Sequence, residues 1–575
     1  MLKIKSILLI NILLITTICY SQWTPNTAVN TTVCDTTNDQ VLVKISPTTD
    51  GGCYISWFDG RSGGYAVYLQ KLDAQGNKQF ASGGLLISNN SQNSSLVDYD
   101  MKTDANNNAI IAFTDIRNSG TVNPFAYCIN PAGTFLWGPN GITLSTSNTT
   151  FQPNPKIAVT YDGYFVIAWI FGSSPNKIAL QKINSTGNKQ WGNDPIYLSG
   201  GGTENFTYPD LVPTNGGGII MLWSGYSGTF LNPQNYRLYT QKFSSNGLPL
   251  WNSTMDTVYG TNYVSGYYVP RIFPAGNFGA IFCWRDFRGN ANYQTGYIQR
   301  IDSSGNFKFP ANGSAVSTLV GNNHFDPVAA DMPSYGGETV AFWYESNNLQ
   351  SSYGVSGQNF SYNGTQLWGS SGIAFQPLWA NQPSNISIYV KDTFAICYYN
   401  ESSGANNIIK AFKVGKSGGM VWSGNIIVAS SISSPKIRLN VTQNSAGMSM
   451  LAWQDNRNDA GGIYAQNINF DGSFGILTGI QPISGKVPDK FSLLQNYPNP
   501  FNPSTNIKYQ IPKNSYVTLK VFDVLGREVM TLVSEKQNAG SYEVSFDGSN
   551  FSSGVYFYKL TAENYDEVKK MLLVK

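Results

Sequence analysis

Few residues of this 575-residue chain could carry out chemistry, and the scarce types limit which reactions are possible. The chain has a single histidine, His324, so a serine–histidine–aspartate or cysteine–histidine mechanism would have to use it as the base. We expect this lone histidine at the surface, in a stretch that connects strands. Zinc sites need clusters of cysteine and histidine, and no C-x-x-C pair is present. These residue types predict no metal site and no cofactor, and they identify no catalytic residue.

Carboxylate chemistry stays open, because glycoside hydrolysis needs only two acidic side chains. Four glutamates are among the few acids outside the repeated positions described below: Glu204, Glu338, Glu345 and Glu401. Nothing in their spacing pairs them.

The cysteines favour structural roles. After residue 21 the chain has five, Cys34, Cys53, Cys128, Cys283 and Cys397, so at least one thiol stays unpaired. Cys34 and Cys53 are the only two close enough in sequence to suggest a local disulfide. Cys283 and Cys397 each precede a repeated aromatic residue, which predicts buried core cysteines.

Aspartate and arginine recur in a W-x-D-x-R pattern. It is complete at Trp57/Asp59/Arg61, Trp284/Asp286/Arg288 and Trp453/Asp455/Arg457. These groups could form a ring of ligand contacts on one face. Alternatively, each aspartate accepts hydrogen bonds from the amides of its turn while the arginine pairs with a neighbour. We favour the structural interpretation, because catalysis needs unique groups in one place and these turns repeat the same group.

The same pattern reveals a repeat. Short apolar runs end in an aromatic anchor at Trp57, Phe113, Trp169, Trp223, Trp284, Trp343, Tyr398 and Trp453, spaced by 54 to 61 residues. About twenty residues after each anchor comes a glycine, and in the first seven repeats an aromatic residue follows it by four, as in Gly187 and Trp191. Repeats of this length without helical periodicity indicate one supersecondary unit used many times.

Each repeat reads as four short strands. In the third repeat we expect them at residues 156–160, 165–169, 177–183 and 189–198, with turns at Asp162-Gly163 and around Gly187. The repeats therefore predict an all-β fold, an eight-bladed β-propeller over residues 22–484. Residues 22–26 resemble 136–140, so we expect the N-terminal segment to complete the last blade. The alternative is that residues 473–484 supply that strand.

A cluster of tyrosines departs from the repeat. Tyr259, Tyr263, Tyr267 and Tyr268 follow the longer insertion at residues 225–235. Exposed aromatic rings with Asn and Ser neighbours would form a glycan-binding platform, and we take these four as candidate ligand-binding residues. They could equally be strand tyrosines with one face buried.

The ends of the chain indicate export. Lys3 and Lys5 precede an apolar run at residues 7–18, followed by small residues near Ser21, which predicts a signal peptide over residues 1–21. No other stretch is apolar enough for a transmembrane span. The formal net charge is only +3, which provides no large field for binding nucleic acid.

The composition changes near the C-terminus. Charged residues make up 18 of the 86 residues from 490 to 575, against about 11% before them. We place a linker at residues 485–490 and a small domain at residues 491–575. Three prolines near its start, Pro498, Pro500 and Pro503, exclude helix and predict an extended entry strand.

This last domain resembles the type A C-terminal sorting domain of the type IX secretion system. The resemblance rests on Asn496, Tyr497, Pro498, Asn499, Pro500, Phe501, Asn502 and Pro503, then Gly526, Gly554, Tyr556, and the lysines from Lys569 to Lys575. It implies an immunoglobulin-like β-sandwich that the outer-membrane secretion machinery recognises. It also implies removal after translocation, with attachment to surface lipopolysaccharide in many members.

Together these features predict a protein at the cell surface of a Gram-negative bacterium. We expect a binding or adhesion protein with a glycan or protein ligand. The alternative is an extracellular enzyme that acts on polysaccharide with carboxylate side chains.

Overall fold

The computed structural model describes residues 22–575 except 93–96, 119, 148, 230–231, 252–254, 261–268, 289–291, 459–460, 477–480, 485–487, 538 and 549–550. The expected signal peptide therefore lies outside the described residues. The chain divides into two compact units, Met1–Gly475 and Ile476–Lys575, which we call the ring unit and the C-terminal unit. Among the described residues, no helix has the length and apolar character needed to cross a membrane.

The ring unit is all-β, as predicted. Its described residues include three one-turn 3-10 helices, η1 (Asn215–Gly217), η2 (Gly276–Phe278) and η3 (Pro333–Tyr335). Its described residues form eight four-stranded antiparallel sheets. In order from first to fourth strand, the sheets are β2–β5 (Gln40–Pro47, Cys53–Asp59, Tyr65–Leu72, Leu85–Gln92), β6–β9 (Asp100–Thr103, Ala109–Asp115, Asn123–Ile129, Ile142–Thr143), β10–β13 (Lys156–Val159, Phe165–Phe171, Lys177–Ile183, Ile196–Leu198), β14–β17 (Asn205–Thr214, Gly218–Thr229, Asn232–Phe243, Asp256–Tyr259), β18–β21 (Arg271–Ala275, Gly279–Asp286, Thr295–Ile301, Ser314–Ala315), β22–β25 (Asn322–Met332, Glu338–Asn347, Tyr353–Phe360, Ile373–Trp379), β26–β29 (Gln382–Lys391, Phe394–Ser403, Asn406–Val414, Ile426–Ser434), and β30–β32 with β1 (Lys436–Gln443, Ser449–Asp455, Gly462–Ile468, Thr31–Cys34).

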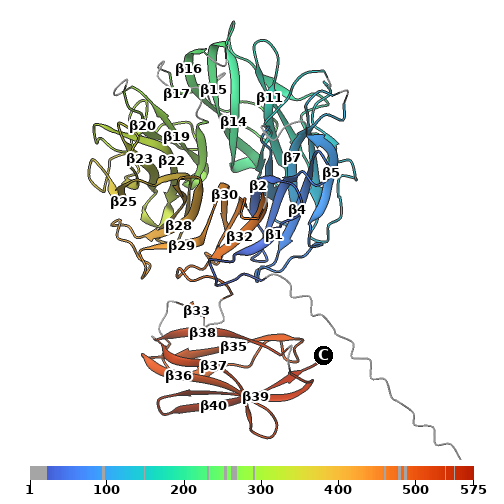
Figure 1. Ribbon diagram of the computed structural model, residues 1–575, viewed down its shortest axis with the longest axis vertical. Coiled ribbons are helices and arrows are strands. Elements are labelled where there is room, and N and C mark those ends of the chain that lie inside the picture. The colour runs from blue at the N-terminus through green and yellow to red at the C-terminus, as the bar shows by residue number, and fades with distance from the viewer. Residues whose placement is uncertain are drawn as a thin grey trace, which may run out of the picture. The chain divides into compact units, whose positions relative to one another are not determined.

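The sheets form a closed ring, which Figure 1 shows in the upper part of the picture. The first strand of each sheet contacts the first strand of the next, in the order β2, β6, β10, β14, β18, β22, β26 and β30, and β30 contacts β2. The first strands therefore surround the centre of the ring.

Each anchor lies on the second strand of its sheet, and all eight are at most 3% exposed. They fill the space between neighbouring sheets. Trp453, for example, packs in one cluster with Tyr398 and Ala411 of the preceding sheet. A large ring at a fixed place in every repeat buries a large apolar area between each sheet and its neighbour.

The N-terminal segment closes the ring, as expected, but through later residues than predicted. The strand that pairs with β32 is β1, Thr31–Cys34, not residues 22–26. Trp23 plays a different part, since its indole Nε1 donates to the carbonyl of Ala74 at 3.1 Å and its ring lies against Gly76. The likeness between residues 22–26 and 136–140 reflects this contact, because Trp137 lies against Gly187 in the same way.

The repeated glycine is the surface on which the aromatic residue of the preceding repeat packs. Trp137, Trp191, Trp251, Trp368 and Trp422 each lie against the glycine of the next sheet: Gly187, Gly247, Gly305, Gly418 and Gly472. Their indole nitrogens donate to carbonyl oxygens beside those glycines at 2.8–3.3 Å. The second landmark of the repeat therefore connects neighbouring sheets.

A pair of glycines in one sheet tests this contact. Both Gly163 (φ +77°) and Gly187 (φ +87°) are left-handed, so alanine at either carries a conformational cost of about 1–2 kcal/mol. Only at Gly187 would the new Cβ meet another group, Trp137 Cδ1 at 2.9 Å. We expect Gly187→Ala to lower the free energy of unfolding by at least about 1 kcal/mol more than Gly163→Ala, measured by urea denaturation. Equal losses would show that the indole contact contributes nothing.

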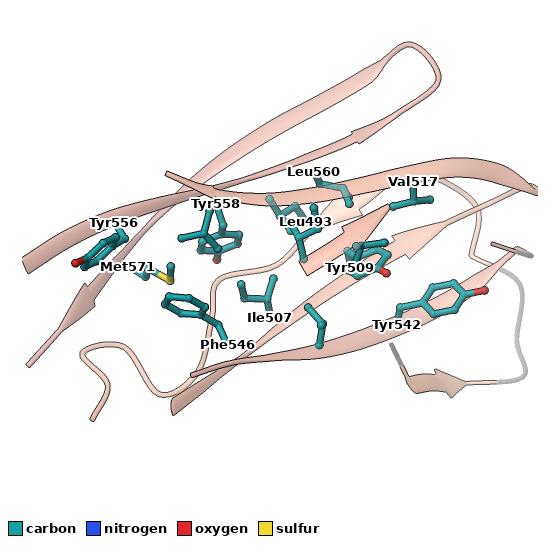
Figure 2. Close-up of a cluster of buried hydrophobic side chains, with 14 of the residues drawn as sticks. Leu493, Ile507, Tyr509, Val517, Tyr542, Phe546, Tyr556, Tyr558, Leu560 and Met571 are labelled. Carbon is teal, nitrogen blue, oxygen red and sulfur yellow. The ribbon is translucent and has the colours of Figure 1, made fainter. Parts of the chain in front are cut away.

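The described part of the C-terminal unit forms two four-stranded antiparallel sheets. Their strand orders are β33-β38-β35-β34 and β37-β36-β39-β40, with bounds β33 (Gln481–Ser484), β34 (Ser492–Leu493), β35 (Ser504–Ile511), β36 (Ser515–Phe522), β37 (Glu528–Gln537), β38 (Gly540–Asp547), β39 (Gly554–Ala562) and β40 (Tyr565–Leu573). Alternate residues of both sheets bury their side chains in one core, which includes Ile507, Tyr509, Phe546, Tyr558 and Met571 (Figure 2).

Two details of this unit differ from the sequence predictions. The unit begins at Ile476, before the expected linker at 485–490, because β33 pairs with β38 and not with the ring. Residues 473–484 therefore do not complete the last sheet. The proline-rich segment is a loop and not an extended strand: only Tyr497 and Phe501 form isolated bridges, with Asn506 and Leu573.

Candidate functional site

The W-x-D-x-R aspartates are occupied within their own turns. Asp59 Oδ2 accepts the indole N–H of Trp57 at 2.8 Å, and Oδ1 accepts the backbone N–H of Arg61 at 3.0 Å. Its side chain is fully buried and pairs with the Arg61 guanidinium. Asp286 and Asp455 likewise accept an indole N–H and pair with the arginine of their own turn. These aspartates are structural and offer no ligand contact.

Arg457 departs from the other two arginines of the pattern, so the three complete turns are not equivalent as the repeat suggested. The Nε atoms of Arg61 and Arg288 donate to the aspartate of the turn at 2.8 and 3.0 Å. Arg457 Nε is buried without a hydrogen-bond partner among the described residues. Its Nη1 donates to the carbonyl of Val29 at 2.7 Å, and its Nη2 donates to Asn30 Oδ1 at 3.1 Å.

Arg457 has different hydrogen-bond partners because of the way in which the ring closes. Arg288 Nη1 donates to the carbonyl of Asn312, which precedes the fourth strand of the same sheet and follows the arginine in sequence. The fourth strand of the last sheet is β1, so the equivalent carbonyl for Arg457 comes from the N-terminal segment, at Val29. Arg457 therefore fastens the two ends of the ring together and is not free to contact a ligand.

Tyr259 belongs to the packing of these turns and not to an exposed platform. It is 1% exposed, and the guanidinium of Arg288 stacks 4.1 Å from its ring centroid and 3.7 Å from that of Tyr297. The other three candidate tyrosines, Tyr263, Tyr267 and Tyr268, lie outside the described residues.

His324 is fully buried, contrary to the expectation of a surface residue. Its ring meets Trp343 edge to face at 6.0 Å, and burial lowers the pKa of His324 to about 4, so the imidazole is neutral. The five cysteines are all buried free thiols, so the disulfide suggested for Cys34 and Cys53 is absent. The buried, neutral His324 is not placed to act as a base for an external ligand. Cys283 lines the cavity described below, but burial raises the pKa of its thiol and keeps it protonated.

The four non-repeated glutamates are held separately. Each has its own partner: Glu204 accepts from Tyr239, Glu338 pairs with Lys416, Glu345 accepts from Ser356, and Glu401 pairs with Lys410. Of these glutamates, none lines the cavity described next.

The ring unit contains a cavity of about 540 Å³ at the first strands of its sheets, which we call the central cavity. Its walls come from residues of β10, β14, β18, β19, β22 and β30, and from residues just before β6, β10 and β18. The polar lining residues are Asp98, Asn154, Lys156, Tyr208, Asp210, Arg271, Arg285, Asp326 and Arg438. None is the aspartate or the arginine that defines a W-x-D-x-R turn, but Trp284 and Arg285, the first two residues of one such turn, form part of the wall. The volume is typical of a small-molecule site.

The backbone around this cavity is unusual. Asn154, Tyr208, Asp326 and Arg438 line it with φ between +48° and +59°, in the left-handed region that side chains other than glycine rarely adopt. Leu42 and Asn385 occupy the same conformation on β2 and β26. The pairing of β14, β22 and β30 with its neighbour shifts register at these points, so each strand bulges. Such conformations cost about 1–3 kcal/mol each and concentrate at functional sites.

A charge cluster forms one side of the cavity. Asp98 bridges two ammonium groups, Lys44 at 2.7 Å and Lys156 at 2.8 Å. Burial alone would raise the pKa of Asp98, but the two lysines outweigh it and hold that pKa well below its usual value. For Asp210 burial dominates and raises the pKa, although Lys156 and Lys102 oppose it. The cavity therefore holds carboxyl groups with opposite pKa shifts.

The Asp98 bridge makes a prediction for acid stability. Its folded pKa lies below the unfolded value of about 3.9, so its stabilisation is complete above about pH 5 and is lost progressively as the pH falls below that value. We expect Asp98→Asn to lower the free energy of unfolding at pH 7 by about 2 kcal/mol, and to flatten the loss between about pH 5 and 2.5. Asp392→Asn, at an exposed aspartate, is the control. Urea denaturation at each pH measures both, and an unchanged slope for Asp98→Asn would contradict the assignment.

Two arginines of the cavity form no salt bridge with a described residue. Arg271 donates from Nη1 to the carbonyl of Ile386 at 3.3 Å, and Arg438 is exposed. Both also line a smaller cavity of about 260 Å³, together with Lys44. Arg285 lies deeper, 3.8 Å from Asp326 and over the ring of Phe325, and burial lowers its pKa to about 10, so it stays protonated at neutral pH.

The motif residues of the C-terminal unit divide into two groups. Asn496, Phe501 and Tyr556 are buried, and the Asn496 side chain donates to Thr505 Oγ1 at 3.0 Å. Tyr497 is 81% exposed. The remaining motif residues are exposed or half-buried: Pro498, Asn499, Pro500, Asn502, Pro503, Gly526, Gly554, Lys569 and Lys575. The motif therefore combines residues that stabilise the unit with residues that remain at its surface.

The C-terminal unit defines this chain as an exported protein. Residues 495–575 match the family model of the secretion system C-terminal sorting domain, as the sequence motif indicated. The chain thus carries a type IX sorting domain, which directs export to the cell surface.

The ring unit has no comparable assignment. No curated protein matches the chain in sequence. Among solved structures, a polysaccharide lyase (ulvan lyase) is 10% identical with a TM-score of 0.44, over 79% of this chain and 98% of its own. An α-L-arabinanase from Penicillium chrysogenum is 12% identical (TM-score 0.32, 56% and 93%), and a protein of unknown function from Dyadobacter fermentans is 10% identical (TM-score 0.34, 56% and 96%). These values assign neither a substrate nor an activity to this chain.

Proposed function

We propose that the ring unit is an eight-bladed β-propeller that binds a glycan in its central cavity, and that the C-terminal unit is an immunoglobulin-like β-sandwich used for export. The mature protein is then a binding or adhesion protein of the cell surface. Eight four-stranded sheets whose first strands contact one another in a closed circuit support the propeller. A shared core between two antiparallel sheets supports the sandwich.

The central cavity is the observation that carries the binding function. Several first strands adopt left-handed conformations there, and the side chains they place in the wall differ from repeat to repeat: Asn154, Tyr208, Asp326 and Arg438. A repeat that serves only stability would keep equivalent positions alike. Carboxylate, amide and phenol groups beside the apolar Val269 and Pro270 suit the hydroxyls and ring faces of a sugar.

A glycan array tests this proposal. The full-length mature chain should bind a defined class of glycan, and Tyr208→Ala should remove that binding. Tyr161→Ala is the matched control, because this tyrosine is 66% exposed and does not line the cavity. Binding that survives Tyr208→Ala, or a protein ligand in place of any glycan, would contradict the proposed site.

An enzyme that acts on polysaccharide is a second candidate, favoured by the two aspartates with opposite pKa shifts. A lowered pKa for Asp98 and a raised pKa for Asp210 are the environments that a base and an acid need. Incubation of the bound glycan with the protein, followed by assay of new chain ends, separates the candidates. If the unchanged protein produces new chain ends and Asp210→Asn does not, the ring unit is an enzyme. If the glycan stays intact, the ring unit is a binding protein.

A further inference from the structure

The cations of the central cavity are not all neutralised. Of its lining cations, Lys156 pairs with Asp98 at 2.8 Å and Arg285 lies 3.8 Å from Asp326. Arg271 and Arg438 line both cavities, and neither has a carboxylate of the described residues within 4.0 Å. The positive charge that remains available to a ligand therefore lies on these two guanidinium groups.

Both arginines are placed by rigid structure. Arg271 begins β18 and pairs with Cys283 of the next strand, and its guanidinium donates to a carbonyl of β26. Arg438 lies at the bulge of β30 with φ +59°. A guanidinium presents paired N–H donors whose geometry matches a carboxylate or a sulfate, and a fixed backbone reduces the entropy lost on binding.

The rest of the wall excludes a simple inorganic anion as the best ligand. Asp210 also lines the cavity and forms no salt bridge with a described residue, so its carboxyl group would repel a small anion that filled the space. The same group can accept or donate a hydrogen bond to a hydroxyl. Tyr208, Val269 and Pro270 add apolar surface. A ligand that matches the two guanidinium groups, the Asp210 carboxyl group and this apolar surface carries an anionic group at one end and hydroxyls on a carbon ring.

We propose that the central cavity selects an acidic saccharide, with the carboxylate or sulfate of one sugar unit bound by Arg271 and Arg438 and its hydroxyls bound beside Asp210. This inference rests on the proposed function, since it names the class of glycan that the same cavity takes. The charge, and not the sugar ring alone, then determines affinity.

The test is isothermal titration calorimetry of the full-length mature chain against four probes: oligogalacturonate, its methyl ester, a sulfated galactan oligosaccharide and its desulfated form. We expect the charged member of at least one pair to bind at least tenfold more tightly than its neutral partner. The pair that responds distinguishes a carboxylate from a sulfate. Arg271→Gln and Arg438→Gln should each weaken that binding at least tenfold.

Arg237→Gln is the control, because it removes the same charge from an exposed position on β16 outside the cavity. Its affinity should equal that of the unchanged chain. Equal binding of charged and neutral partners, or equal losses in all three variants, would overturn the acidic-saccharide inference and leave glycan binding intact. No heat of binding with any of the four saccharides would overturn the proposed function as well.

Discussion

A chain that ends at Gly475 is expected to fold normally and to be missing from the cell surface. The ring closes through β1, so removal of Ile476–Lys575 takes no strand from its sheets. Every hydrogen bond between the last sheet and the N-terminal segment remains. The sorting domain at residues 495–575 lies wholly in the part removed, so the truncated chain loses its export signal.

Cell fractionation measures this result. The full-length chain should be at the surface or in the medium, and the truncated chain should accumulate in the periplasm as a protease-resistant, folded protein. The matched control restores the C-terminal unit: the same residues attached to a periplasmic reporter should carry that reporter to the surface. Truncated protein outside the cell at the full-length level would disprove the sorting role, and unfolded periplasmic protein would show that the boundary at Gly475 is misplaced.

Much of the ring could be predicted from the sequence because its stability depends on residues that repeat. In the third repeat the expected strands at 156–160, 165–169 and 177–183 correspond to β10, β11 and β12. Every anchor is buried on a second strand, since each sheet must bury the same surface against its neighbour. The fourth strand was predicted too long: Lys189 only bridges to Ile183, and β13 begins at Ile196.

The central cavity could not be predicted for the opposite reason. Equivalent positions of different repeats line its wall with different residue types, for example Tyr208, Asp326 and Arg438. No recurring residue type therefore identifies these positions in the sequence. Their common property is a left-handed backbone conformation, which sequence patterns reveal mainly for glycine and asparagine. Neighbouring positions of this kind are 53 to 59 residues apart, as for Asp326, Asn385 and Arg438, but this spacing becomes a signal only when the bulges are known.

The exposure of two side chains, Tyr259 and His324, was predicted wrongly from the sequence. Tyr259 is buried because the guanidinium of Arg288 packs between its ring and the ring of Tyr297. His324 is buried because it lies on strand β22 and not in a connecting stretch, where its ring meets Trp343. Tyr259 contacts residues of the next sheet, whereas His324 meets Trp343 of its own sheet, and a single sequence displays neither contact.

Arg457 shows where the repeat itself misleads. Its place in the W-x-D-x-R pattern predicts the contacts of Arg61 and Arg288, yet two of its hydrogen bonds go to Val29 and Asn30, more than 400 residues earlier in the chain. A residue that recurs in every repeat has the same contacts only in those sheets whose four strands are consecutive in sequence. The last sheet borrows its fourth strand from the N-terminus, so its arginine meets different partners.

The largest expected loss of stability follows from the anchors. Trp453→Ala should lower the free energy of unfolding by about 3–5 kcal/mol, because it removes a fully buried ring from the cluster between two sheets. It also takes from Asp455 a hydrogen bond of 2.9 Å from the indole, which leaves a buried carboxylate with one donor fewer. Trp284→Ala should behave similarly, although Trp284 also forms part of the cavity wall.

Trp379→Ala provides the matched control, because it removes the same side chain from the end of β25, where the ring is 68% exposed. An exposed truncation away from a network changes stability by about 0.5 kcal/mol or less. Urea denaturation of the full-length mature chain, followed by near-ultraviolet circular dichroism, compares the two variants under one set of conditions. A difference below about 1 kcal/mol between them would mean that the anchors do not hold neighbouring sheets together, and that the glycine contacts of the next repeat carry that role instead.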